Sequence, residues 1–315
     1  MKRKLPGALI LLAVVSVFPL SLSANGIATV VVDRAGNVYF SDYIRNRVWK
    51  LAPGGPPSVW VRGKHTHHLV LDQNGALYGE EITPRGVAQG IWAASPDGHV
   101  SDLFRAKRKG QSANYRGTVF TVDRSGSLLF LRDCQIAKLT ADGRLESWAG
   151  RRCSGDVWKS DTLRYGHLHG SLAWGPDATL YFSDARSVRR VAPEGIVTTL
   201  GGTPVTLFAD PQPGEARFDR AVGLAVDTGG NVYVAENHDR TVKRVAKDGS
   251  TTTVGRLPFF WSPTGLGLSG ETLYVVANLR IPTPGFLAGV VGNPSVFAVT
   301  PAGKLSSVAS ARGSR

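Results

Sequence analysis

Cysteine is scarce in this sequence, and long apolar runs are absent after its first 24 residues. The chain has 315 residues but only two cysteines, Cys134 and Cys153, and two thiolates cannot form a zinc–cysteine cluster. No later segment is apolar for long enough to span a membrane. No stretch there keeps a helical period, which argues against an α-helical repeat fold. A Ser–His–Asp order, a glycine-rich phosphate loop and a haem motif are also missing.

The first 24 residues have the pattern of a secretory signal peptide. Basic residues at positions 2–4 precede an apolar core, Leu9–Leu20, and small residues end the segment at Ala24. Such a segment is removed on export, and an uncleaved anchor is the alternative. We therefore expect a secreted or periplasmic protein whose mature chain, residues 25–315, forms one domain. In that oxidising compartment Cys134 and Cys153 are expected to form a disulfide, closing a loop of about 20 residues and contributing about 3 kcal/mol.

The charge is strongly basic. The formal net charge is +13, and the three charges at positions 2–4 leave with the signal peptide. A basic surface favours anionic neighbours, such as cell-wall polymers, lipid headgroups or acidic sugars. The basic residues are scattered, with one true run at 105–109, and export argues against nucleic acid as a partner. We expect a monomer with an unknown ligand or envelope partner, and no transmembrane segment in the mature chain.

One motif recurs six times: a short apolar run, a turn, and a second short run that ends in an acidic or polar residue. The copies begin at Ile27, His67, Gly117, Gly170, Ala221 and Pro263. The equivalent turn positions are taken as Asp33, Asp72, Asp123, Gly175, Asp227 and Leu268, which lie 39 to 52 residues apart. This period is close to the length of a four-stranded propeller blade.

Each copy contains four short β-strands, here called A to D. Apolar residues alternate on both sides of the turn at 33–37, which is typical of a hairpin. A four-stranded sheet cannot bury both faces alone, whereas six sheets packed radially can. The sequence therefore predicts an all-β fold, a six-bladed β-propeller with four-stranded antiparallel blades. The ring is expected to close by blade packing, without exchange of a strand. The expected blades are residues 26–63, 64–108, 116–152, 168–202, 220–256 and 262–310.

Residues 214–255, GEARFDRAVGLAVDTGGNVYVAENHDRTVKRVAKDGSTTTVG, resemble an NHL repeat. Residues 187–202, SVRRVAPEGIVTTLGG, and the first blade resemble it as well. The resemblance covers most of the chain after residue 24 and implies a propeller fold. It does not imply one function, because NHL-type propellers include binding scaffolds and several enzymes.

Histidines gather at one rim of the predicted propeller. The start of strand A and the end of strand B meet at one mouth of the central channel. Six of the seven histidines fall there, namely His65, His67, His68, His167, His169 and His238. Imidazole is a common metal ligand and an acid–base group near neutral pH. Histidines that only hydrogen-bond loops are the alternative interpretation.

Acidic residues fall at the same rim. Nine residues after the equivalent turn position stand Asp42, Glu81, Asp184 and Glu236. The structural interpretation of such an acid is that it fixes the following turn or pairs with a base on strand C. The doublet formed by Glu80 and Glu81 is different, because its blade has a long B–C loop at 82–90. This doublet is the stronger functional candidate.

Three functions are compatible with this rim. The leading one is recognition of a ligand or partner without chemistry. In the second, carboxylates and an amide hold Ca²⁺, as in the gluconolactonase and paraoxonase propellers to which the chain is similar, and which hydrolyse lactones and esters. The candidates are Glu81, Asp184, Glu236 and Asn237. The other asparagines of that group are mostly missing here.

In the third function the metal is Zn²⁺. The run HHLVLD at 67–72 resembles the strand-A start of the peptidyl-hydroxyglycine lyase domain. The resemblance implies His67 as a ligand, with His169 one residue away from its matching position. Because the third expected histidine is absent, Glu81 or His238 would complete a tetrahedral shell. Whether the protein is an enzyme stays open at this stage.

Overall fold

The structure is a computed structural model of the chain. It describes residues 29–83, 88–105, 120–132, 135–139, 145–150, 171–183, 187–202, 218, 220–283, 286–290 and 294–310. The expected signal peptide, the cysteine pair Cys134 and Cys153, and the site candidates His167, His169 and Asp184 lie outside these residues.

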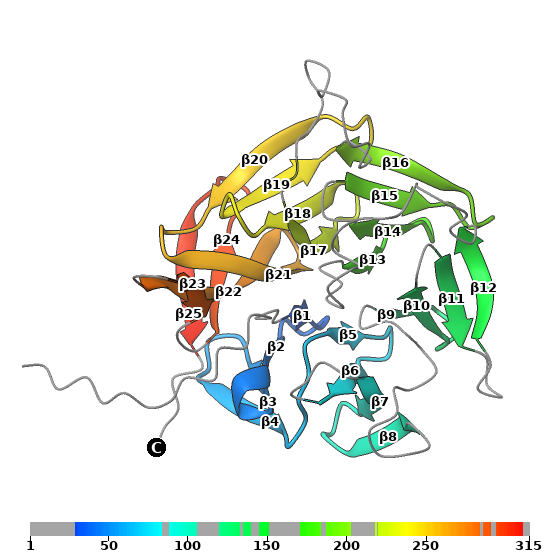
Figure 1. Cartoon of the computed structure of the whole chain (residues 1–315), viewed down its shortest axis with the longest axis horizontal. Coiled ribbons are helices and arrows are strands. Elements are labelled where there is room, and N and C mark those ends of the chain that lie inside the picture. Colours follow the sequence, from blue (N-terminus) through cyan, green and yellow to red (C-terminus); the bar gives the residue numbers. More distant parts are fainter. Residues whose placement is uncertain are drawn as a thin grey trace, which may run out of the picture.

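Six antiparallel sheets stand around a central axis, and each contains strands that follow one another in the sequence (Figure 1). Blades one to three consist of β1 (Val30–Val32), β2 (Val38–Asp42), β3 (Arg47–Leu51), β4 (Pro57–Arg62), β5 (Leu69–Leu71), β6 (Leu77–Ile82), β7 (Ala88–Ala94), β8 (Val100–Arg105), β9 (Phe120–Val122), β10 (Leu128–Arg132), β11 (Gln135–Leu139) and β12 (Leu145–Gly150). The predicted six-bladed, all-β propeller is confirmed.

Blades four to six consist of β13 (Leu172–Trp174), β14 (Leu180–Ser183), β15 (Ser187–Val191), β16 (Val197–Gly202), β17 (Ala221–Val226), β18 (Val232–Glu236), β19 (Thr241–Val245), β20 (Thr251–Arg256), β21 (Trp261–Ser269), β22 (Thr272–Thr283), β24 (Ser295–Val299) and β25 (Leu305–Ser310). A fifth strand of blade six, β23 (Phe286–Val290), pairs with β22. Within the described residues the one helical element is a 3₁₀ turn, η1 (Tyr43–Arg45), and no helix there is long and apolar enough to cross a membrane.

The hairpin between strands A and B is held by its turn residues. In blade one Asp33 Oδ1 accepts hydrogen bonds from Ala35 N (3.0 Å) and Asn37 N (2.8 Å), as an Asx turn does. Gly36 has φ 81°, a conformation that glycine adopts without strain. The same carboxylate pattern recurs at Asp72 and Asp123. The turn chemistry therefore repeats with the chain and fixes each hairpin register.

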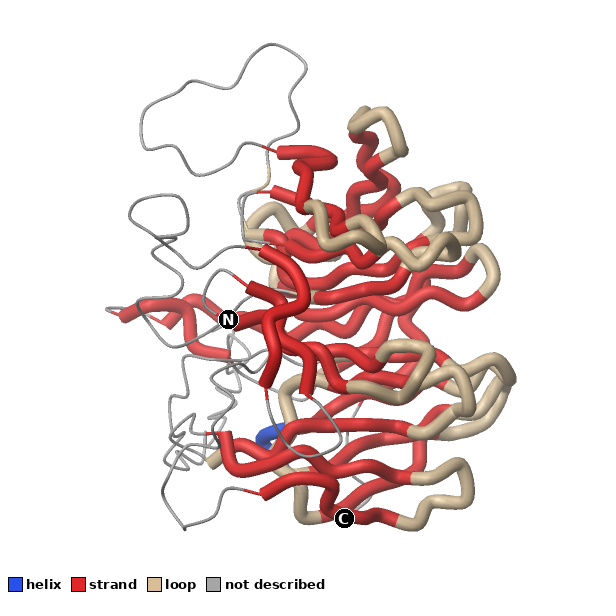
Figure 2. The backbone as a smooth tube through the Cα atoms, turned by 90° about the vertical axis from the view of Figure 1, so that its right-hand side faces the viewer, coloured by secondary structure: helices blue, strands red, loops and turns tan. Residues whose placement is uncertain are grey.

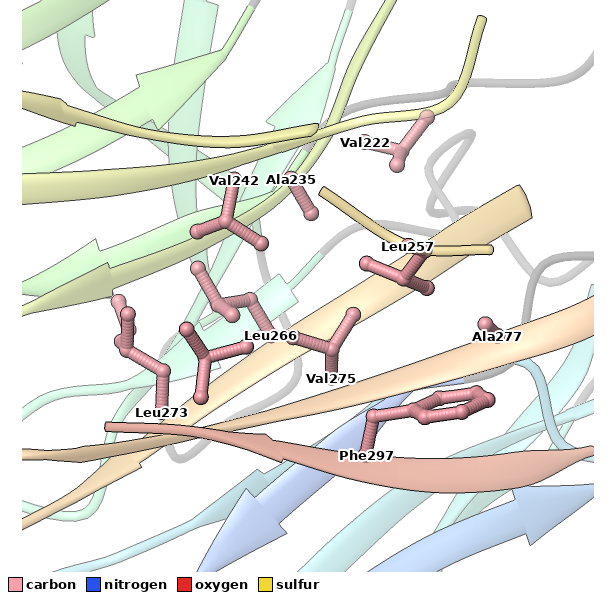
Figure 3. Packing of buried hydrophobic residues seen from close by; sticks show 11 residues of the cluster. Val222, Ala235, Val242, Leu257, Leu266, Leu273, Val275, Ala277 and Phe297 are labelled. Carbon is pink, nitrogen blue, oxygen red and sulfur yellow. The ribbon is translucent and has the colours of Figure 1, made fainter. Parts of the chain in front are cut away.

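Apolar layers between neighbouring blades form the core. Val242 of β19 packs with Val275 of β22 and Phe297 of β24, and Figure 3 shows their side chains converging between blades five and six. The contact between the first and last blades is of the same kind, since Phe40 of β2 packs in one cluster with Val276 of β22. The ring thus closes by packing, without an exchanged strand, as the repeat predicts.

In blade six, the residue assigned from the repeat to the turn position is off by one. Leu268 pairs with Leu273 in β22, as Val32 pairs with Val38 in blade one. Leu268 is therefore a strand residue and not the equivalent of the turn position Asp33. The A–B turn of this blade is one residue shorter than that of blade one, which the spacing of apolar residues did not reveal.

The ends of the strands define two faces of the propeller. The A–B and C–D turns lie on one, which we call the turn face. The starts of strand A and the ends of strand B lie on the other, the rim face, together with η1. Figure 2 shows most described turns on one side of the molecule and η1 toward the other.

Candidate functional site

At the rim face, a side chain of strand B accepts the first backbone hydrogen bond of strand A. Ser41 Oγ accepts from Thr29 N in blade one, and Ser183 Oγ accepts from Ser171 N in blade four, both at 3.1 Å. Glu80 occupies this position in blade two. One member of the predicted doublet therefore repeats a framework position with a longer, ionisable side chain.

Glu80 is fully buried below the strand-A start of blade two. Its Oε1 accepts hydrogen bonds from His67 N and His68 N, both at 2.9 Å. Its Oε2 is buried without a hydrogen-bond partner. Burial raises the pKa of Glu80 well above its usual value, and the two backbone N–H groups offset this only in part. The environment therefore favours the protonated carboxyl, which is cheaper to bury than a carboxylate.

Two histidines form a hydrogen-bonded pair above Glu80. His67 Nε2 lies 3.1 Å from His65 Nε2. His65 Nδ1 lies 2.9 Å from Asn46 Oδ1, and the His67 ring stacks on Tyr43 with ring centroids 4.7 Å apart. Tyr43 belongs to η1, and Asn46 ends it in a left-handed conformation (φ 53°). The connection after strand B of blade one therefore positions both imidazoles of blade two.

Two acceptors of blade one contact the His65 ring: Asn46 Oδ1, 2.9 Å from Nδ1, and the Tyr43 backbone. With Asn46 Oδ1 as the acceptor, His65 Nδ1 carries the hydrogen of that contact. In the neutral ring His65 Nε2 is then an acceptor, to which His67 Nε2 can donate. Burial lowers the pKa of His65, and a second proton between two imidazoles at this separation is disfavoured by like charge. In this arrangement the basic nitrogen of His65 and the N–H of His67 bond each other.

His68 has a different environment from its two neighbours. It is 6% exposed, and burial lowers its pKa to about 4. It is therefore a neutral core side chain near pH 7. Of the three histidines of blade two, His65 and His67 are half-buried and can meet a ligand at the rim face.

The carboxylate of Glu81 is directed away from the histidines by an ion pair. Lys64 Nζ lies 3.0 Å from Glu81 Oε2 and 2.7 Å from Asp102 Oδ1. Asp102 belongs to β8, the outermost strand of the blade. The structure therefore places Glu80 against the backbone of His67 and pairs Glu81 with Lys64.

The acids at the ends of the other B strands also have structural partners. Asp42 is fully buried and accepts from Arg45 N (3.3 Å) and Trp49 Nε1 (3.3 Å). Glu236 is fully buried and lies 2.5 Å from Lys243 Nζ of β19. Both arrangements match the structural interpretation: one acid fixes the following turn, and the other pairs with a base on strand C.

The last two rim candidates differ in exposure. Asn237 is 3% exposed, and its Nδ2 donates to Pro263 O at 2.7 Å. Its Oδ1 is buried without a hydrogen-bond partner. His238 is exposed. Both residues belong to blade five, three blades further along the chain than the histidine pair of blade two.

Comparison with known families fits this architecture. A family model described as SMP-30/Gluconolactonase/LRE-like region matches residues 26–278. The chain belongs to this family. The propeller of gluconolactonase type that the NHL-like repeats implied is thereby confirmed. No curated protein matches the chain.

Solved structures similar to this family member share its fold at low sequence identity. A gluconolactonase from Xanthomonas campestris is 16% identical, with TM-score 0.55, over 80% of this chain and 84% of that one. A virginiamycin B lyase from Staphylococcus aureus is 14% identical, with TM-score 0.52, over 90% and 84%. A luciferin-regenerating enzyme is 14% identical, with TM-score 0.56, over 90% and 94%.

The expected metal ligands do not converge in the described part of this family member. Glu81 and Glu236 are bound to lysines. No three His, Cys, Asp or Glu side chains among the described residues are grouped as a metal site would require. Asp184 of the expected Ca²⁺ set and His169 of the expected Zn²⁺ set lie outside the described residues, and the chemistry proposed below uses the side chains of the chain itself.

Two contacts of the histidine pair were missed in the sequence. Tyr43 and Asn46 belong to blade one, and their sequence shows only an ordinary B–C turn. The role of Glu80 could have been predicted from the repeat. Glu80 aligns with Ser41 and Ser183, and short polar side chains at such a position are typical of residues that hydrogen-bond the backbone. Only the structure shows that the turn of one blade supports the histidines of the next.

Proposed function

We propose that the protein hydrolyses a small cyclic ester at the rim face, with His65 and His67 as its acid–base pair. The observation that carries the proposal is the 3.1 Å contact between the two Nε2 atoms. It brings a basic nitrogen and an N–H donor to one point. Membership of a family whose model is named for gluconolactonase supports a lactone as the substrate. Export, as the first 24 residues suggest, makes an envelope or extracellular lactone the expected source.

The reaction needs one proton taken up and one given. In the substrate complex the attacking water replaces the direct contact between the two rings, and His65 Nε2 takes its proton while the water oxygen bonds to the ester carbonyl carbon. The ring C–O bond then breaks, and the leaving alkoxide takes this proton from the His65 imidazolium, which restores the neutral ring. His67 Nε2–H donates a hydrogen bond to the oxyanion and keeps its hydrogen. General acid–base catalysis of this kind contributes about 10²- to 10⁴-fold to the rate.

Neighbouring residues position the pair for this step. Asn46 holds the tautomer of His65 through its contact with Nδ1, and Tyr43 fixes the plane of the His67 ring by stacking. Glu80 fixes the backbone of His67 from below. Because the environment of Glu80 favours its neutral form, this residue adds no negative charge near the histidines. A carboxylate there would stabilise protonated imidazoles, which cannot act as bases.

The test is turnover of a panel of γ- and δ-lactones, followed by acid release. His65→Gln and His67→Ala are expected to lower kcat/KM by about 100-fold, with an unchanged melting temperature. His99→Ala is the matched control, because His99 is exposed in the C–D turn of blade two on the turn face. Full turnover by both rim variants, or no turnover of any lactone by the wild type, would refute the proposal.

Binding without chemistry is the second candidate, and a separate observation favours it. Among the described rim residues, lysines pair with Glu81 and Glu236, which occupies two of the carboxylates expected to hold a catalytic cation. If lactones bind to the wild type and are recovered unchanged, while His67→Ala loses the binding, the rim is a recognition site. Calorimetry combined with product analysis distinguishes the two candidates.

A further inference from the structure

A second cavity lies on the turn face, opposite the histidine pair. It has a volume of about 580 Å³ and is bounded by the A–B turns of blades two, three and four and by the C–D turn of blade four. Trp148 of β12 and Trp174 of β13 form its apolar part, and Arg124 and Lys138 are among its polar groups. Its volume falls within the range of small-ligand pockets, which combine apolar walls with a few polar groups.

At the interface of blades one and two a lysine covers the tryptophan of the equivalent position. Trp60 of β4 stands where Trp148 stands in β12, because Pro57 and Leu145 begin the two strands in the same register. Lys50 Nζ lies 4.2 Å from the centroid of the Trp60 ring and covers it. The opening at blade three is therefore a departure from the framework of the repeat.

Different contacts keep the cavity of blade three open. Lys138 occupies the position of Lys50, but its Nζ is held 3.0 Å from Asp123 Oδ2. The Trp148 ring instead meets Trp174 edge-on, with centroids 6.1 Å apart and planes at 61°. Trp174 Nε1 donates to Val122 O at 2.9 Å. The two indoles are thus fixed at an angle to one another on the cavity wall.

Two departures from the repeat lie at the blade-four side of the site. Trp174 stands where blade two has Leu71, since each pairs with the first residue of its B strand. The following residue, Gly175, replaces the turn aspartate of blades one, two, three and five. A Cβ atom at Gly175 would lie 2.9 Å from the ring of Tyr181. A large aromatic group and a missing side chain therefore occur together at the cavity.

The polar groups of the cavity suit a neutral ligand. Two carboxylates, of Asp72 and Asp123, stand beside two cations, of Arg124 and Lys138, so their formal charges cancel. Both carboxylates already accept hydrogen bonds within their own turns. Arg124 uses one nitrogen, Nη2, on Pro176 O at 3.1 Å, and the rest of its donors stay available. Hydroxyl groups can accept from such donors and also give hydrogen bonds to the carboxylates.

We propose that this cavity binds a neutral saccharide of one or two hexose rings. The C–H face of a pyranose packs on an indole, and its hydroxyl groups meet the polar groups of the turns, which matches the two kinds of wall described above. The site is separate from the proposed lactone site, because the two lie at opposite ends of the strands. It gives the protein a means of attachment to glycans.

Calorimetric titration with maltose, cellobiose, lactose and trehalose tests the proposal on the full chain. At least one sugar is expected to bind, with Kd raised about tenfold or more in Trp148→Ala and in Trp174→Leu. Trp174→Leu restores the residue type of blade two and so preserves packing. Trp60→Ala is the matched control, because it removes the covered tryptophan at the same strand position, and it is expected to bind normally.

Each other outcome overturns part of this assignment. Absence of binding by all four sugars would refute the saccharide site. Binding that survives both cavity variants would place the sugar elsewhere. Tight binding of benzoate or glucuronate at these tryptophans, with none of the neutral sugars, would identify an anion site instead. Lactone turnover is expected to be unchanged in both variants, so the result is independent of the function proposed for the rim face.

Discussion

The burial of His68 makes a specific prediction about stability and pH. The imidazole is 6% exposed, and burial lowers its pKa from 6.5 to about 4. His68→Phe keeps a ring of similar size in the core and removes the titration. The variant should therefore lack one component of the pH dependence of folding, whatever its effect on packing.

The sign and size follow from proton binding. Between pH 6.5 and 4 the unfolded chain binds a proton at His68 that the folded chain does not bind, so stability falls as the pH is lowered. With these two pKa values the loss between pH 7 and pH 5 is about 2 kcal/mol. Glu80 acts in the opposite direction, because its raised pKa makes the folded state bind its proton more tightly. Comparing wild type with variant isolates the histidine contribution.

Urea denaturation at pH 7 and pH 5 measures this difference. The loss of unfolding free energy on acidification is expected to be about 2 kcal/mol larger in the wild type than in His68→Phe. His99→Phe is the control for the ring substitution itself, since His99 is exposed. Equal losses in wild type and His68→Phe would show that the imidazole is solvated, and the account of the strand-A start would then be wrong.

Three further substitutions test the framework by chemical denaturation. Glu80→Ala leaves two buried N–H groups without an acceptor and should cost about 2–3 kcal/mol, whereas Glu80→Gln keeps the acceptor and should cost less. Gly223→Ala places a Cβ 2.7 Å from a backbone nitrogen of blade six and should lower the free energy of unfolding by about 1–3 kcal/mol. Gly55→Ala is its control, because a Cβ there makes only ordinary contacts, and it should change the free energy of unfolding by less than about 0.5 kcal/mol. Lys243→Met removes the lysine from the fully buried Glu236 and should cost about 3 kcal/mol.

The fold was predictable because its determinants are local and repeated. The turn aspartates Asp33, Asp72 and Asp123 accept the same hydrogen bonds in three blades, so a sequence pattern reports the structure directly. The error at Leu268 has a physical reason. A hairpin shortened by one residue keeps its apolar alternation, and the side-chain pattern alone does not count the residues within the turn.

The candidate site was less predictable, because its contacts cross from one blade to the next. The sequence singled out the doublet Glu80–Glu81, but adjacent residues of a strand point to opposite faces. The hydrogen-bond or ion-pair partner of each carboxylate decides where it lies: His67 N for Glu80 and Lys64 for Glu81. Lys64 and Asp102 hold Glu81 outward, and nothing in the spacing of these residues indicates that ion pair.

Departures from the repeat separate function from framework in this propeller. In blade two, Glu80 replaces the strand-B serine that accepts the first hydrogen bond of strand A, and the histidine pair lies above it. In blade four, Trp174 and Gly175 replace an aliphatic residue and a turn aspartate. The two groups lie at opposite ends of the strands, so a substitution in one leaves the contacts of the other intact. Coupling between them would have to pass along the strands and through the side-chain packing between separate sheets. Independent effects of rim and cavity variants are therefore the expected behaviour of this structure.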